Sequence, residues 1–184
     1  MKVVFFIIIA LFSVQAMFAQ TNYYKDHSRL KTETSTFVVE NKVEGGEKYY
    51  IVYNMDNKHR QTPFDAIEIQ TWNGQYKEIY EMVARERDNP HIIRAMKEVF
   101  TEEEIAAMKA TNEKIALAFV HDNKGIISEV SFAFPDDPVF YSIPPEKWLA
   151  WEEKIKEYLI FPVPAPFEDN TWYKSQYLYL WEIE

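Results

Sequence analysis

The strongest structural signal in this sequence lies in residues 115–134, which read IALAFVHDNKGIISEVSFAF. In the first half, Ile115, Leu117, Phe119 and His121 alternate with Ala116, Ala118 and Val120. In the second half the alternation resumes, with Ile127, Glu129, Ser131 and Ala133 set against Ile126, Val130, Phe132 and Phe134. The run Asp122-Asn123-Lys124-Gly125 between them has turn composition. A period of two on both sides of a turn predicts a β-hairpin.

Downstream of this hairpin, the sequence predicts a loop, a helix and a last strand. Residues 135–144 are expected to form the loop, and Pro144-Pro145 to open a helix that reaches Leu159. An apolar stripe at helical spacing marks its inner side: Trp148, Trp151, Ile155, Tyr158 and Leu159. Prolines at every second position make residues 161–166 extended. The final strand is expected at about 172–183, with one face made by Tyr173, Tyr177, Tyr179, Trp181 and Ile183.

Upstream, a second hairpin is predicted around Gly45-Gly46, because both central positions of such a turn can take positive φ. Its strands are residues 37–44 and 49–53, and a third strand is expected at 66–72. Apolar positions at helical spacing predict a helix over 75–87. Asn89-Pro90 opens a short helix through Phe100. Thr101 and Glu104 form a capping box for a further helix, with Ile105 and Met108 inward.

Together these elements predict an α+β domain with the order β-β-β-α-α-α-β-β-α-β. Its sheet is mostly antiparallel and its helices pack on one face. We expect a single domain over residues 35–184, preceded by a loose lead-in at 20–34, which is polar and has no clear period.

The first 19 residues have the order of a secretory signal peptide: Lys2, an apolar run over 3–12, and a small-residue exit. Cleavage is expected after Ala19, with Ala16 as the rival site. No cysteine stands at either place, so we expect no lipid anchor. The apolar run is also short for a spanning helix. The mature protein is therefore expected in the periplasm or outside the cell, with no membrane span after cleavage.

The composition excludes several kinds of chemistry. A formal net charge of −9 repels phosphate backbones, so nucleic acid is not an expected partner. With no cysteine there is no thiol catalysis, thiolate metal site or disulfide. The four glycines all lie in expected turns, which leaves none for a phosphate-binding loop. The four histidines are well separated along the chain, and we expect neither metal nor cofactor at them: His27, His59, His91 and His121.

Whether the protein is an enzyme stays open at this point, although catalysis is not the expected function. A Ser–His–Asp triad draws its members from anywhere in a chain, so sequence order does not test it. A pair of carboxylates for glycoside hydrolysis would arise by chance among 29 acidic residues. No particular residue is singled out as catalytic.

Residues 115–184 resemble a degenerate C-terminal domain of TonB-type energy transducers. The matching features are the hairpin just described, a helix ending in Tyr158-Leu159-Ile160-Phe161-Pro162, and a final strand of alternating aromatics. The resemblance implies that hairpin and helix pack together and that the final strand lies at a sheet edge, where an extended peptide pairs with it. The transducers' membrane anchor and proline-rich spacer have no counterpart, so we do not expect energy transduction. The whole chain also resembles small exported proteins of Gram-negative gut bacteria whose function is uncharacterised.

The leading hypothesis is therefore a non-catalytic binding domain that adds a partner strand at a sheet edge. Its expected partner is a protein or an extended peptide of the cell envelope. The candidate partner-binding residues lie in the final strand: Tyr173, Lys174, Gln176, Tyr177, Tyr179 and Trp181. An inhibitor or chaperone-like role falls within the same hypothesis.

The alternative is carbohydrate binding, or weak glycosidase action, by exposed aromatic rings. The candidates are the five tryptophans: Trp72, Trp148, Trp151, Trp172 and Trp181. Trp148 and Trp151 fit the apolar helical stripe, which favours a place in the core for these two.

Overall fold

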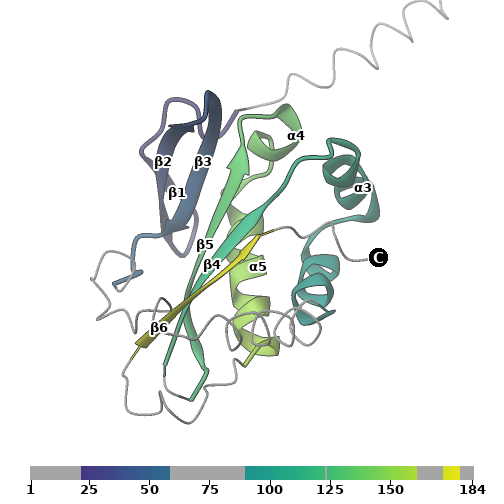
Figure 1. Ribbon diagram of the computed structural model, residues 1–184. Helices are drawn as coiled ribbons and strands as arrows, with labels where there is room; N and C mark the ends of the chain where they lie inside the picture. Colours follow the sequence, from purple (N-terminus) through teal and green to yellow (C-terminus); the bar gives the residue numbers. More distant parts are fainter. Residues whose placement is uncertain (1–21, 59–89, 123, 161–171, 179–184) are drawn as a thin grey trace, which may run out of the picture.

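The computed structural model describes residues 22–58, 90–122 and 124–160, and the backbone of 172–178. Six antiparallel strands form one sheet in the order β1-β2-β3-β5-β4-β6. The longest helix in the described residues, α5 (Pro145–Tyr158), lies against one face of this sheet (Figure 1). The α+β class and the mostly antiparallel sheet predicted from the sequence are confirmed.

The central hairpin consists of β4 (Ala116–Asp122) and β5 (Ile127–Pro135), as the alternation predicts. Its turn is closed by Asp122, whose Oδ1 accepts hydrogen bonds from the backbone N–H groups of Lys124 and Ile126, at 2.8 and 2.9 Å. Gly125 has a φ of 79°, which glycine adopts without steric cost. The register shifts between Val120 and His121, where the strand departs from strict alternation.

The second hairpin is also confirmed, between β2 (Thr36–Glu44) and β3 (Glu47–Asn54). Gly45 and Gly46 have φ values of 62° and 91°, so both central positions need the left-handed freedom that glycine provides. β3 then pairs with β5, which joins the two hairpins into one sheet.

The described part of the expected loose lead-in, residues 22–34, is packed and partly a strand. β1 (Arg29–Lys31) pairs with β2, and the side chain of Tyr24 is fully buried. The Tyr24 hydroxyl donates to the Ile143 carbonyl at 2.5 Å and accepts from Trp148 Nε1 at 2.8 Å. These contacts join positions far apart in the sequence, so the local polar pattern around Tyr24 gives no sign of them.

The helices before β4 agree with the prediction where they are described. One helix covers residues 90–99, and α3 (Glu102–Ala110) follows it. The capping box is present: Thr101 Oγ1 accepts from the Glu104 N–H, and Glu104 Oε2 accepts from the Thr101 N–H at 2.8 Å. Met108 is buried as expected, and Ile105 packs against the core.

The expected loop at 135–144 contains a short helix, α4 (Pro138–Tyr141). Asp137 caps it by accepting from the Val139 N–H at 2.8 Å, and Pro138 occupies its first turn. Phe140 is fully buried. A four-residue helix is too short for a periodic apolar pattern, so only the Asp-Pro pair indicates it.

The core lies between the sheet and α5. The Trp148 ring stacks on Phe134, with centroids 4.8 Å apart and an interplanar angle of 3°. The Trp151 ring stacks on Phe132 at 5.1 Å. Both tryptophans are fully buried, which confirms the core position that their helical spacing favours.

Several expected elements lie outside the described residues: the leader at 1–19, the strand at 66–72, the helix at 75–87, the extended segment at 161–166, and the final strand beyond 178. None of the helices in the described part of the chain has the length and apolar content that crossing a membrane requires.

Candidate functional site

The final strand, β6 (Trp172–Leu178), pairs antiparallel with β4 and stands last in the strand order (Figure 1). In the described part of the structure no further strand lies beyond it. Four of the candidate partner-binding residues belong to this strand: Tyr173, Lys174, Gln176 and Tyr177. Tyr179 and Trp181 lie outside the described residues.

The direction of the main-chain groups in the sheet follows from contacts at β5. Asn57 Nδ2 donates to the Val130 carbonyl at 3.1 Å, from the side of the sheet where β3 ends. At the other end of β5, the Asp136 N–H donates to the Lys48 carbonyl at 3.0 Å. In an antiparallel strand the N–H and C=O groups of one residue point to the same side, and successive residues alternate between the two sides. Even-numbered residues of β5 from Val130 onward therefore direct both groups away from β4.

The same alternation carries across β4 to β6. Phe119 lies opposite Val130, so its main-chain groups face β6, where Ser175 is its partner. Ser175, Tyr173 and Tyr177 therefore direct their N–H and C=O groups toward β4. The alternate residues direct theirs to the outer side: Trp172, Lys174, Gln176 and Leu178.

The register also assigns the residues of β6 to the two faces of the sheet. Tyr173 and Tyr177 lie opposite His121 and Leu117. They share the face that α5 covers, because residues directly opposite one another lie on the same face. Lys174 and Gln176 belong to the other face. Tyr173 and Tyr177 thus share one face, as the period of two predicts.

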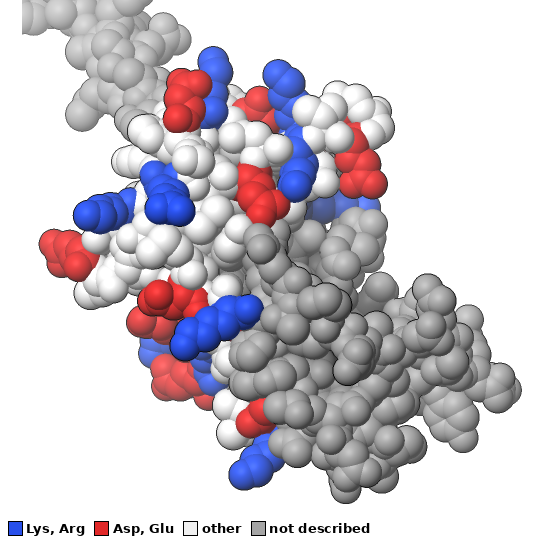
Figure 2. Space-filling view, turned by 90° about the vertical axis from the view of Figure 1, so that its left-hand side faces the viewer, with Lys and Arg blue, Asp and Glu red and all other residues white. Residues whose placement is uncertain are grey.

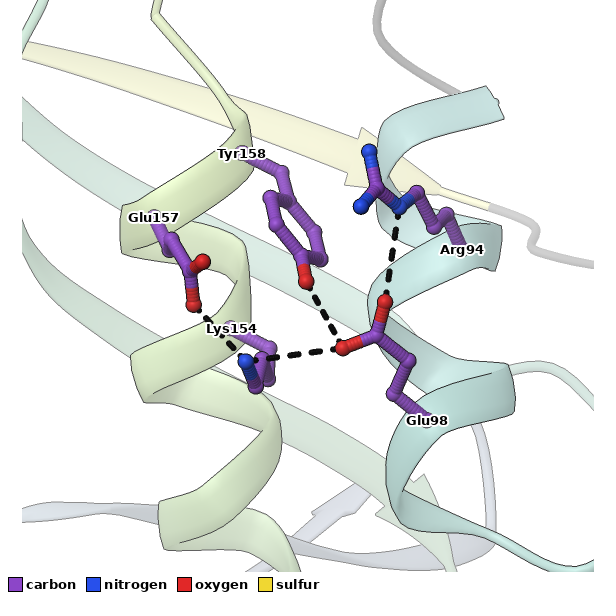
Figure 3. A network of polar contacts seen from close by, with 5 residues as sticks. All are labelled: Arg94, Glu98, Lys154, Glu157 and Tyr158. Carbon is purple, nitrogen blue, oxygen red and sulfur yellow. Dashed lines mark hydrogen bonds and ion pairs between the residues drawn. The ribbon is translucent and has the colours of Figure 1, made fainter.

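A polar network links the helix of residues 90–99 to α5 (Figure 3). The Glu98 carboxylate accepts from the Tyr158 hydroxyl at 2.7 Å and pairs with Lys154 and Arg94, each at 3.4 Å. The hydrogen bond from Tyr158, followed by those from the two cations, lowers the pKa of Glu98. Lys154 also pairs with Glu157 at 2.8 Å, and this contact raises the pKa of Lys154.

This network holds the two helices together. The Arg94 guanidinium lies 4.1 Å from the centre of the Tyr158 ring, and the hydroxyl of the same ring donates to Glu98. Every charge in the group has an opposite charge beside it, and the side chains are partly exposed. No group in the network is left poised for proton transfer or for binding an ion.

Glu152 is the most deeply buried carboxylate in the described residues. It lies on α5, with its side chain 1% exposed, and its Oε1 is 2.5 Å from Lys156 Nζ. Oε2 has no hydrogen-bond partner in that part of the chain. Burial raises the pKa of Glu152 more than Lys156 lowers it. The group is therefore placed to affect the stability of the fold.

The histidines in the described residues do not lie in one cluster. His121 is buried, its Nδ1 lies 3.0 Å from the Asp122 carbonyl oxygen, and burial lowers its pKa. His27 and His91 are exposed, and His59 lies outside the described residues. Among the residues that the structure describes, no three His, Asp or Glu side chains are grouped to hold a metal ion.

The tryptophans considered for sugar binding fall into two groups, those in the core and those whose side chains the structure does not describe. Trp148 and Trp151 are in the core and present no ring to a ligand. Trp172 is the first residue of β6, and Trp72 and Trp181 lie outside the described residues. The carbohydrate hypothesis therefore depends on these last three positions and stays a prediction.

Charges of both signs are mixed over the surface. Figure 2 views the molecule from the side of β1, β2 and β3, and over the described residues on this face basic and acidic side chains are mixed, without a continuous basic area. Nothing on this face favours a polyanion as partner.

Comparison with known proteins gives a fold relationship. No protein-family model matches the sequence, and no curated protein matches it significantly. The crystal structure of a DUF5043 family protein from Bacteroides uniformis ATCC 8492 superposes with a TM-score of 0.62 over 86% of this chain and 87% of that one. The two sequences are 17% identical over the match, so the likeness is one of fold.

Proposed function

We propose that this protein is an exported, non-catalytic binding domain that recognises an extended peptide or protein segment by strand addition at β6. The observation that carries the proposal is the position of β6 at the end of the strand order, with the main-chain groups of alternate residues directed outward. An added strand would take its affinity from these groups and its selectivity from alternate side chains.

The TonB-type resemblance of residues 115–184 supports the same site. It implies a hairpin and helix packed together with the final strand at the edge, and β4, β5, α5 and β6 have this order and arrangement. The leader at residues 1–19 supports a location in the periplasm or outside the cell, where the partner would be a component of the envelope.

Affinity capture from an envelope extract tests this proposal when it is combined with matched proline variants. Gln176→Pro removes an outward N–H of β6 and no bond to β4, so the domain should fold while the partner is lost. Lys31→Pro is the control, because by the same alternation Lys31 directs its N–H outward at the opposite edge. Both variants should melt near the wild-type temperature. Equal capture by wild type and Gln176→Pro would show that the β6 edge is not the site.

A further inference from the structure

We infer that the strand that adds to β6 is β6 of a second copy of this chain, antiparallel across a twofold axis. The inference rests on the proposed strand addition and names its partner: the protein captured from an envelope extract through β6 would be a second copy of this exported chain. The two copies would form one continuous sheet, with the axis perpendicular to it and both α5 helices on the same side.

The main-chain pattern of β6 is self-complementary. In an antiparallel pair, residues directly opposite each other either both direct their groups inward or both direct them outward. The outward residues of β6 are Trp172, Lys174, Gln176 and Leu178. Pairing centred on Ser175 sets Lys174 opposite Gln176 and Trp172 opposite Leu178, so the outward residues of the described part of the strand face one another in pairs.

The charges of β6 favour the same register. Lys174 is the one formally charged residue in the strand. Pairing centred on Lys174 would set two lysines opposite each other, which is destabilising, whereas pairing centred on Ser175 sets each lysine opposite an amide. The net charge of −9 on each chain opposes association in general. At physiological ionic strength this repulsion is screened beyond about 8 Å.

The aromatic residues add a favourable contact in this register. Tyr173 of one copy lies opposite Tyr177 of the other, and the twofold axis creates this pair twice. Both positions belong to non-hydrogen-bonded pairs, in which opposite Cα atoms are only about 4.5 Å apart. Aromatic cross-strand pairs of this kind stabilise an antiparallel sheet.

The absence of cysteine from the sequence makes a direct test of register possible. Ser175 lies opposite its own counterpart, at a Cα separation of about 4.5 Å that a disulfide spans. The Lys174 positions of the two copies are more than about 7 Å apart in this register, which a disulfide does not span without backbone movement. S175C should therefore form a covalent dimer under mild oxidation, whereas the yield of covalent dimer from K174C should be lower by about tenfold or more. Equal cross-linking by the two variants would overturn the inference.

Analytical ultracentrifugation over a concentration series provides a second measurement that needs no cysteine. The wild-type protein should show a monomer–dimer equilibrium, and K174P should raise the dissociation constant by about tenfold or more, since each copy loses one main-chain bond. K31P, at the other edge, should leave the dissociation constant unchanged. A wild-type protein that is monomeric at every concentration would overturn the inference.

The two proposals fail in distinguishable ways. A monomeric protein whose envelope capture is abolished by Gln176→Pro overturns pairing between copies and leaves strand addition at β6 standing. A dimer that survives both K174P and Q176P, with no loss of envelope capture, overturns both.

Discussion

The two outer strands of the described sheet differ in length and in charge, two properties that govern strand addition. β1 has three residues, of which Arg29 and Lys31 are exposed cations and Leu30 packs against the core. β6 has seven residues and a single charge, Lys174. Short, charged edges resist pairing with another chain, whereas long, nearly neutral edges invite it. On length and charge, β6 is therefore the edge at which we propose that a partner strand adds.

The segment that leads into β1 is held in place by contacts with the sheet and the core. Just before β1, the Ser28 carbonyl accepts from the Val39 N–H at 3.0 Å. A few residues earlier, Tyr24 packs edge-on against Phe134 at 5.2 Å, beneath the sheet. β1 is short, but the segment leading to it is anchored in the core.

The largest expected effect comes from releasing this anchor. Tyr24→Ala should lower the free energy of unfolding by about 3–5 kcal/mol, as truncation of a buried large aromatic does. The hydrogen bonds to Ile143 and Trp148 are lost with the ring. Urea denaturation measures the change, and Tyr23→Ala, at a partly buried neighbour, is the matched control and should cost less. A loss below about 1 kcal/mol for Tyr24→Ala would contradict the anchor.

The next largest effect on stability distinguishes residues of β6 whose main-chain groups face β4 from residues whose main-chain groups face outward. Ser175→Pro removes a main-chain bond to β4 and should cost about 1–3 kcal/mol, whereas Gln176→Pro removes none and should change stability by about 0.5 kcal/mol. Thermal melting decides between them. If the two prolines are equally disruptive, the main-chain directions derived from Asn57 and Val130 are wrong, and β6 is not an open edge of the kind described.

The sequence predicts the elements whose signal is local. The hairpin at 115–134, the glycine turn at 45–46 and the tryptophan stripe of α5 are each contained in a short window, and all three are confirmed. The burial of Tyr24 depends on residues more than a hundred positions away, so no local pattern contains it. β1 pairs with a strand close by, but its three residues are too few to show a period of two.

The candidate site was predictable to a similar extent. The period of two predicts the final strand, which contains four of the named residues, whereas its place at an edge was only what the resemblance implies. Partner binding by these residues stays a prediction. Which of these residues direct their main-chain groups outward depends on β3 lying beside β5 and on the contact from Asn57 to Val130. That information exists only once the strand order is known.

A smaller, pH-dependent effect is expected at Glu152 on α5, the helix that covers the sheet, away from both sheet edges. Burial raises the pKa of Glu152, so the folded state holds this proton more tightly than the unfolded chain. The stabilisation is present below the unfolded pKa, near 4.3, and is lost as pH rises through the folded value. Glu152→Gln should therefore gain stability relative to wild type between about pH 4 and pH 7.

Urea titrations at several pH values measure this difference. Glu102→Gln, at an exposed position of α3, is the control and should show no such trend. A constant difference between Glu152→Gln and wild type over this range would mean that Glu152 is not desolvated in the folded protein.

The smallest expected effect on stability tests what protects β1. Replacing both Arg29 and Lys31 by threonine should change the free energy of unfolding by about 0.5 kcal/mol or less at each site, because both are exposed. The same double variant should associate through β1, which would appear as a new, larger species in size-exclusion chromatography. If it stays like the wild type, the shortness of β1 is sufficient protection without its charges.

The anchoring of Tyr24 also has a consequence for the order of folding. Its two hydrogen-bond partners lie 119 and 124 positions later in the chain, so a very large loop must close before the contact forms. The β2–β3 hairpin can form early, but a two-stranded hairpin alone is marginally stable in water. High contact order of this kind slows folding. The amino-terminal half should thus stay largely open during synthesis until α5 has emerged, and the sheet should close as a late, cooperative event.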